Sequence, residues 1–174
     1  ITTAGIGVVE HPHAISAVSI RPGDRVILSG TIADHGIAIL AARGGFSFQS
    51  NVRSDSAPLH SLVQTMLNAG GKGIHALRDP TRGGVAATLN EFAVKANVGI
   101  CIDENCISVA PAVRGACELL GLDPLYVANE GKLIAIVAPE LAETVLAVMR
   151  SHPLGRQAVM VGDVIADQPK IVSM

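Results

Sequence analysis

The sequence is poor in aromatic residues, with three Phe, one Tyr and no Trp among its 174 residues. Proteins that bind single-stranded nucleic acid stack bases on aromatic side chains. The formal net charge of −2 also gives no broad basic surface for a phosphate backbone. We therefore expect no nucleic-acid partner. Because 49% of the residues are hydrophobic, the core must consist of Ala, Val, Ile and Leu, which suits the packed layers of an α/β domain.

Long apolar runs are also missing, and the run at 133–138 has only the length of a strand. The first residues, ITTAGIGVVE, have neither an initiator Met nor the basic segment of a signal peptide. We expect a cytoplasmic protein with no membrane partner, and a chain that is a fragment or a processed product.

Cysteine is scarce, and its spacing fits neither a disulfide framework nor a paired-cysteine zinc site. The three are Cys101, Cys106 and Cys117. Cys101 falls in an expected strand and Cys117 on the apolar stripe of an expected helix, so both should be small buried hydrophobic residues. The His11-Pro12-His13 sequence does not have the ligand spacing of a regular element, which argues against a metal site there.

Hydrophobic periodicity predicts strands alternating with helices in the order βααβαβαβαβ, which favours an α/β layer structure. The expected strands are 26–29, 74–78, 98–102, 132–138 and 159–165, and the expected helices are 34–43, 59–67, 83–96, 111–120 and 139–151. Residues 44–58, rich in Gly and Ser, are expected to form a loop.

Residues 75–92, HALRDPTRGGVAATLNEF, combine the end of a strand, a turn rich in Gly and Pro, and an amphipathic helix. Two interpretations of the turn are open. Asp79 and Thr81 can cap the helix, with Gly83 and Gly84 serving its packing. Alternatively, the free N–H groups and positive dipole end of the helix, approached across the two glycines, can bind an anion or a nucleotide phosphate, with Asp79 as a metal ligand.

Two further polar positions lie beside expected elements. Glu130, in an Asn-Glu-Gly turn before a strand, is placed between apolar segments, where loss of hydration prepares a carboxylate for proton transfer. The alternative is a hydrogen-bonded turn carboxylate without chemistry. His35, near the start of the helix at 34–43, is either satisfied by the backbone or faces a cleft.

Three motifs together resemble one family: GTIADHG at 30–36, RDPTRGG with TLNE at 78–91, and LDPLYVANEGKL at 122–133. They are similar to the C-terminal half of the carbamoyl dehydratases of nickel–iron hydrogenase assembly. That family lies in the superfamily of aminoimidazole ribonucleotide synthetase and selenophosphate synthetase. The resemblance covers nearly the whole chain.

The resemblance implies a mixed β-sheet covered by helices, in α/β layers, as in the C-terminal domains of this superfamily. Residues 21–174 would form that domain, and residues 1–20 would be the end of an N-terminal ATP-binding domain or the crossover from it. It also implies a homodimeric full-length protein that uses ATP and Mg. The implied partners are the carbamoyltransferase HypF and the HypC–HypD iron-carrier complex.

The family's reaction dehydrates an S-carbamoyl group on the protein's own C-terminal cysteine to a thiocyanate, the source of cyanide ligands for the hydrogenase iron. By resemblance, Glu130 would deprotonate the carbamoyl nitrogen, Asn129 would support it, and Asp79 would help to hold Mg–ATP. The other candidate nucleotide contacts are Thr81, Arg82, Gly83, Gly84, Asn90 and His35.

The sequence departs from the family at both ends. The ATP-binding domain is not among these 174 residues, and the chain ends QPKIVSM where the family ends Pro-Arg-Ile-Cys. We therefore expect that the isolated chain neither hydrolyses ATP nor becomes carbamoylated. Two alternatives to the carbamoyl dehydratase interpretation remain open: the same domain of a selenophosphate or purine-pathway synthetase, and a non-catalytic binding module.

Overall fold

The computed structural model describes residues 4–44 and 52–174. Within them the strands are β1 (Arg25–Leu28), β2 (Ile74–Arg78), β3 (Gly99–Ile102), β4 (Ile134–Val137), β5 (Val159–Ile165) and β6 (Val172–Ser173), and the α-helices are α1 (Asp34–Ala42), α2 (His60–Gly70), α3 (Gly84–Ala96), α4 (Pro111–Leu120) and α5 (Pro139–Ser151). This order is the predicted one, with β6 added. The loop expected at 44–58 falls partly on 45–51, outside the described residues, while 52–58 form neither helix nor strand.

All six strands form one sheet in the order β2-β4-β1-β5-β3-β6. The neighbouring pairs are antiparallel except β3 and β6, which are parallel. The sheet is therefore mixed, as the resemblance implied.

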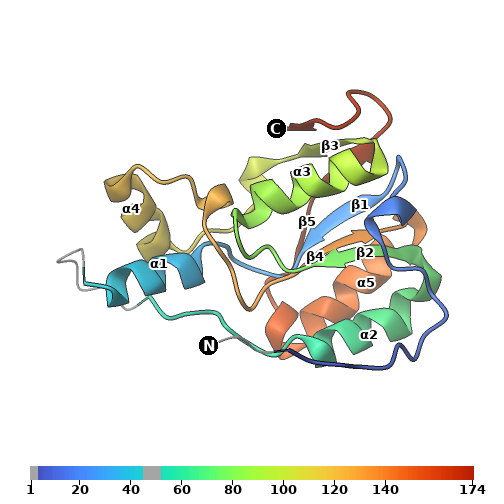
Figure 1. Cartoon of the computed structure of the whole chain (residues 1–174), viewed down its shortest axis with the longest axis horizontal. Helices are drawn as coiled ribbons and strands as arrows, with labels where there is room; N and C mark the ends of the chain where they lie inside the picture. Colours follow the sequence, from blue (N-terminus) through green and yellow to red (C-terminus); the bar gives the residue numbers. More distant parts are fainter. Residues whose placement is uncertain (1–3, 45–51) are drawn as a thin grey trace.

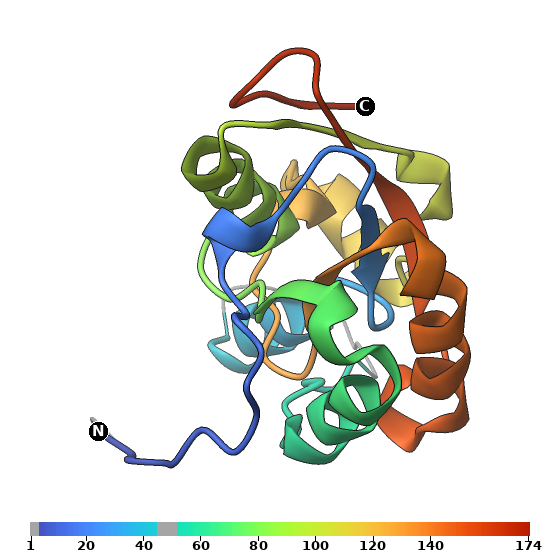
Figure 2. The ribbon, with the colours of Figure 1, turned by 90° about the vertical axis from the view of Figure 1, so that its right-hand side faces the viewer.

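Helices cover both faces of this sheet, and alternation along β1 shows how. Val26 and Leu28 pack in the cluster that contains the apolar stripe of α3, whereas Ile27 packs with α2 and α5 on the other face. Successive strand residues point to opposite faces, so a strand buried on both sides has no polar alternation. Figures 1 and 2 show α3 on one side of the sheet and the α2–α5 pair on the other.

A third apolar cluster lies beyond the end of the sheet, where α1 and α4 pack together (Figure 1). Cys117 is buried there, as expected. The prediction that Cys101 is buried is wrong, because its side chain is exposed. Its neighbours Ile100 and Ile102 face the α3 side, and the helices on the opposite face, α2 and α5, pack in a cluster with β1, β2 and β4.

The helices in the described ranges, 4–44 and 52–174, include none with the length and apolar character required to cross a membrane.

Candidate active site

The buried side chain of Asn129 joins the three sequence motifs at one end of the sheet. Its Oδ1 accepts a hydrogen bond from the backbone N–H of Ala33 at 2.8 Å. Its Nδ2 donates to the carbonyl oxygens of Pro80 and Val127, both at 3.1 Å. Its own backbone N–H also donates to Pro80, at 3.2 Å. A fully buried amide with these partners is a structural centre that fixes three loops relative to one another.

The turn before α3 gets its shape from two consecutive glycines in the left-handed region, Gly83 at φ +75° and Gly84 at φ +63°. Neither Asp79 nor Thr81 caps the helix; the N-cap is Gly83, and it makes no side-chain cap bond. The capping prediction is wrong because these left-handed residues turn the chain between Thr81 and the helix. The N–H of Gly84 donates instead to the carbonyl of Thr81 at 3.0 Å.

Gly84 also permits a close approach between two motifs. A Cβ atom at this position would lie 2.4 Å from the carbonyl oxygen of Leu125 and 2.8 Å from that of Val127. The start of α3 therefore packs directly on the backbone of the segment that leads to Asn129. The glycine that the sequence offered for phosphate approach serves protein packing in this structure.

The first motif reaches the same place through the start of α1. The N–H of Gly36 donates to the carbonyl of Ala128 at 3.0 Å, and a Cβ at Gly36 would lie 2.3 Å from the side chain of Val127. His35 is partly buried, and its Nδ1 lies 2.8 Å from Ser54 Oγ. A side chain of the following loop is thus the partner of His35, in place of the backbone.

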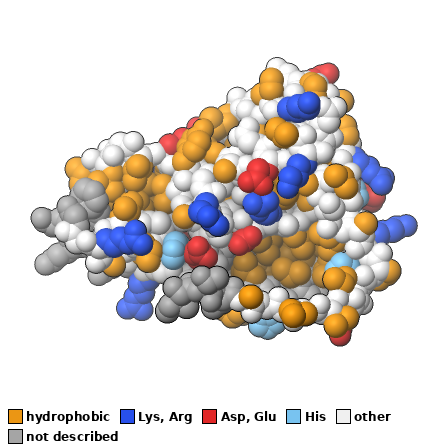
Figure 3. Space-filling model, viewed as in Figure 1, with side chains coloured by type: hydrophobic (Ala, Val, Ile, Leu, Met, Phe, Trp, Pro, Cys, Tyr) orange, Lys and Arg blue, Asp and Glu red, His pale blue; other side chains and the backbone are white. Residues whose placement is uncertain are grey.

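Asp79 and Glu130 are each one residue from the hydrogen-bonded pair Pro80–Asn129, so the fold brings these two carboxylates into one loop cluster. Both side chains are exposed, as is that of Arg82, and none of these three side chains has a hydrogen bond or ion pair with another described residue. The buried carboxylate that the sequence suggested at Glu130 is therefore not found. Figure 3 shows basic and acidic side chains gathered in the middle of the face seen in Figure 1.

Asn90 lies elsewhere. It is six residues into α3 from Gly84, about 9 Å along the helix axis, and its Nδ2 donates to the carbonyl of Ala86 at 2.8 Å. It lines a small cavity of about 100 Å³ together with Tyr126 and Met174. Among the predicted residues, Asn90 is the one that the fold does not direct toward the loop cluster.

An ion pair that the sequence did not reveal supports the Glu130 loop. Lys132 Nζ lies 3.1 Å from Asp55 Oδ2, and both side chains are largely buried, 14% and 6% exposed. Asp55 Oδ1 accepts weakly from the N–H of Glu130 at 3.4 Å. A Cβ at Gly131 would lie 1.6 Å from the carbonyl oxygen of Asp55, so this loop passes directly over the glycine. Asp55 comes from a segment without periodicity, and nothing in the sequence indicates its partner.

The described residues contain no group of three or more His, Cys, Asp or Glu side chains that could enclose a metal ion. Mg²⁺ is commonly held by one or two carboxylates together with substrate phosphates, and it keeps several waters. The exposed, unpaired carboxylate of Asp79 fits one such ligand. As a whole, the site can present two fixed carboxylates and a guanidinium to a ligand that approaches from solvent.

This arrangement of sheet, helices and motif loops agrees with a defined family. Residues 21–174 match the model of the AIR synthase related protein, C-terminal domain, and the chain belongs to this family. The chain is also 57% identical over all its 174 residues to carbamoyl dehydratase HypE of Bradyrhizobium diazoefficiens, of which it covers 50%.

Two solved structures are similar as well. The crystal structure of a HypE–HypF complex matches with a TM-score of 0.87 and 41% identity over 92% of this chain and 52% of that one. A structure of HypE in complex with ATP matches with a TM-score of 0.85 and 44% identity over 91% of this chain and 49% of that one. The chain therefore spans about half the length of the relatives it matches.

Proposed function

We propose that this chain is the C-terminal half of an ATP-dependent carbamoyl dehydratase that serves nickel–iron hydrogenase maturation. The observation that carries the proposal is the junction at Asn129, where three motifs separated in the sequence meet and hold Asp79 and Glu130 in adjacent loops. The identity of 57% to a relative named carbamoyl dehydratase, along the entire chain, supports the reaction type.

The proposed reaction converts an S-carbamoyl cysteine and ATP into a thiocyanate, ADP and phosphate. The carbamoyl oxygen attacks the γ-phosphorus of ATP, and ADP leaves. The C–O bond then breaks, the oxygen departs with the phosphate, and the nitrogen loses both protons to give the nitrile. No oxidant or reductant is required.

In this reaction Glu130 accepts a proton from the carbamoyl nitrogen. A positioned general base contributes about 10²- to 10⁴-fold to the rate of such a step. Asn129 contacts no solvent, and its role is to position the loop that carries Glu130. Asp79 would supply one oxygen ligand to a metal bound with ATP, and Arg82 would offer a charge-assisted hydrogen bond to phosphate.

Residues 1–20 belong to the end of an ATP-binding domain or its crossover, and residues 21–174 form the C-terminal domain. The protein acts in the cytoplasm as a homodimer with HypF and a HypC–HypD complex, and Mg accompanies ATP. The crystal structure of a HypE–HypF complex and the structure of HypE with ATP support the HypF and ATP parts of this assignment.

The test uses the complete reading frame around this segment, purified with a carbamoylated C-terminal cysteine and supplied with Mg and ATP. Intact-protein mass spectrometry follows the loss of one water from the modified cysteine. We expect Glu130→Gln to slow this loss by at least about 100-fold. Glu143→Gln, an exposed carboxylate change on α5, is the matched control and should leave the rate unchanged.

If Glu130→Gln dehydrates at the rate of the unchanged protein, the role of Glu130 is wrong. If the complete protein phosphorylates a selenide or a purine precursor instead of a carbamoyl group, the synthetase alternative replaces the proposal. The isolated 174-residue chain should show neither ATP hydrolysis nor carbamoylation.

A further inference from the structure

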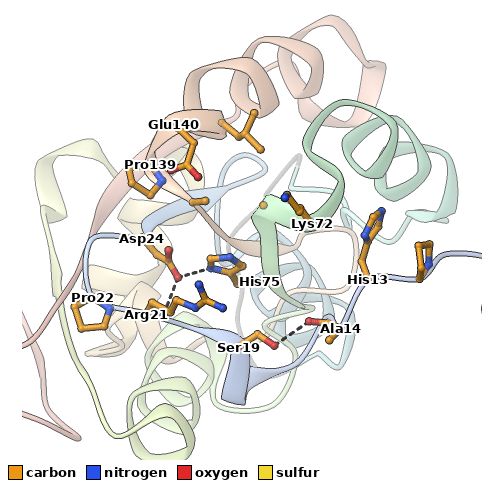
Figure 4. Close-up of a pocket in the computed structure, with 14 residues that line it drawn as sticks. His13, Ala14, Ser19, Arg21, Pro22, Asp24, Lys72, His75, Pro139 and Glu140 are labelled. Atoms are coloured by element: carbon orange, nitrogen blue, oxygen red, sulfur yellow. Dashed lines mark hydrogen bonds and ion pairs between the residues drawn. The ribbon is translucent and has the colours of Figure 1, made fainter.

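An open cavity of about 660 Å³ lies at the end of the sheet opposite Asn129. Figure 4 shows the residues that line it. It forms where β1 and β2 begin and β4 ends, and its lining comes from the segments at 12–24, 72–75 and 138–141. Cavities of roughly 300–1,000 Å³ are the usual size for small-molecule sites. None of the three motifs contributes to it.

A buried dyad forms one wall of the cavity. Asp24 is 2% exposed, and its Oδ2 accepts hydrogen bonds from the backbone N–H of Arg21 at 2.8 Å and from His75 Nδ1 at 2.7 Å. A carboxylate only accepts, so the Nδ1 atom of His75 carries the proton of this bond. The Nε2 atom is then the ring atom left for a ligand: it accepts from a ligand hydroxyl such as that of a protonated phosphate, and it donates to an anion when both ring nitrogens carry protons.

The backbone of β2 directs His75 toward this wall. Ile74 pairs with Val137 and Ala76 pairs with Ile136, so His75 is the extra residue of a β-bulge. Its carbonyl accepts from the N–H of Ser16 at 2.9 Å instead of from the sheet. Bulges of this kind redirect a side chain and are common beside functional sites.

Two basic side chains also line the cavity. Arg21 and Lys72 are exposed, and neither forms an ion pair with a described residue. The Asp24 carboxylate forms no ion pair with the Arg21 guanidinium, and its Oδ2 accepts from His75 and from the Arg21 backbone N–H. Figure 4 shows the Arg21 side chain extending toward His75 within the cavity.

The opposite rim limits what can bind. Glu140, in the first turn of α5, is exposed and also lines the cavity. Its negative charge interacts favourably with the positive end of the helix dipole. The same charge repels a ligand that is negative along its whole length. A small anion with its charge at one end avoids Glu140 and reaches the two cations.

We propose that this cavity binds a small phosphate or carboxylate anion between Arg21, Lys72 and the Nε2 side of His75. Arg21 supplies a planar pair of donors that suits either anion, and Lys72 supplies a mobile point charge. The Asp24–His75 pair and the bulge fix the imidazole against which the anion rests. This site is independent of the proposed carbamoyl chemistry.

The test is a titration of the ¹⁵N-labelled 174-residue chain with inorganic phosphate, and separately with acetate, at constant ionic strength. We expect saturable amide shifts confined to residues near 21–24 and 72–75 for at least one of the two anions. Arg21→Ala and Lys72→Ala should each weaken binding about ten-fold or more, because each removes a charge-assisted hydrogen bond to the anion. Both side chains are exposed, so neither variant should disturb folding.

Arg114→Ala removes one exposed positive charge from α4 and should bind as tightly as the unchanged chain. Saturation by phosphate alone defines a phosphate site, and saturation by acetate defines a site that accepts carboxylates. The proposal is overturned if neither anion saturates the shifts, or if the two cavity variants bind no more weakly than Arg114→Ala.

Discussion

Asn129 donates twice to the carbonyl oxygen of Pro80, from its backbone N–H at 3.2 Å and from its side-chain amide at 3.1 Å. The two loops are thereby joined residue to residue, with no solvent access to the Asn129 side chain. Both candidate carboxylates lie one residue from this junction: Asp79 precedes Pro80, and Glu130 follows Asn129.

Asn129→Ala should destabilise the chain by roughly 2–4 kcal/mol, because it leaves the Ala33 N–H and the carbonyls of Pro80 and Val127 short of their partners. Urea unfolding followed by circular dichroism measures the change. Asn68→Ala, an exposed change on α2, should stay within about 0.5 kcal/mol. Equal stabilities for the two variants would contradict the structural role of Asn129.

Gly84→Ala should destabilise by roughly 2–4 kcal/mol, since the new methyl group would meet the carbonyl of Leu125 and the residue would stay at φ +63°. Gly115→Ala is the paired control in α4, where a Cβ has nothing within 4 Å. That change should stabilise the helix by about 0.5–1 kcal/mol. The opposite signs are measurable in one series of thermal or urea unfolding curves.

The order and type of the main elements could be predicted because their signals are local. Apolar periodicity, the Pro at the start of α4 and α5, and Gly121 after α4 all lie within the elements they define. The strand β6 was missed because it has two residues and depends on its parallel pairing with β3.

The residues of the candidate site could be predicted from the sequence better than the contacts that they make. The motifs identified Asn129, but its partner Ala33 is far away in the sequence, and no local pattern reports a hydrogen bond at that range. The cap prediction for Asp79 failed because a preference for Asp before a helix does not reveal where the backbone turns left-handed. The prediction for Cys101 failed because the burial of a strand residue depends on which helices pack on its face of the sheet, and the sequence does not show this.

The Lys132–Asp55 ion pair should couple strongly, because both side chains are largely buried. Lys132→Met alone should lower the free energy of unfolding by about 3 kcal/mol, because it leaves a buried carboxylate without its charge partner. In a double-mutant cycle with Asp55→Asn, the double variant should be less destabilised than the sum of the two single variants, by more than about 1 kcal/mol. The exposed pair Arg78–Glu91 is the control, and its coupling should not exceed about 1 kcal/mol. Additive costs at Lys132 and Asp55 would show that the pair contributes nothing.

Thiol reactivity should follow the surroundings of each cysteine. The thiol of Cys106 donates to Asp103 Oδ2 at 3.4 Å, and this hydrogen bond, with the adjacent negative charge, raises the pKa of Cys106. Burial raises the pKa of Cys117. Because the thiolate is the reactive form, Asp103→Asn should lower the pKa of Cys106 and accelerate its alkylation at pH 8 several-fold.

Peptide mapping after a timed exposure to iodoacetamide measures the alkylation. The exposed Cys101 serves as the internal reference, and Cys117 should remain protected in both proteins. An unchanged rate at Cys106 in Asp103→Asn would rule out control by the carboxylate.

The strand order has a consequence for folding during synthesis on the ribosome. Strands β1, β2 and β3 make no pair among themselves; β1 and β2 each pair with β4, and β3 pairs with β5 and β6. About a hundred residues separate β1 from β4, which translation at 5–20 residues per second covers in roughly 5–20 seconds. β1 waits unpaired through that interval, β2 and β3 wait with it once they emerge, and the sheet assembles only when the final third of the chain is made.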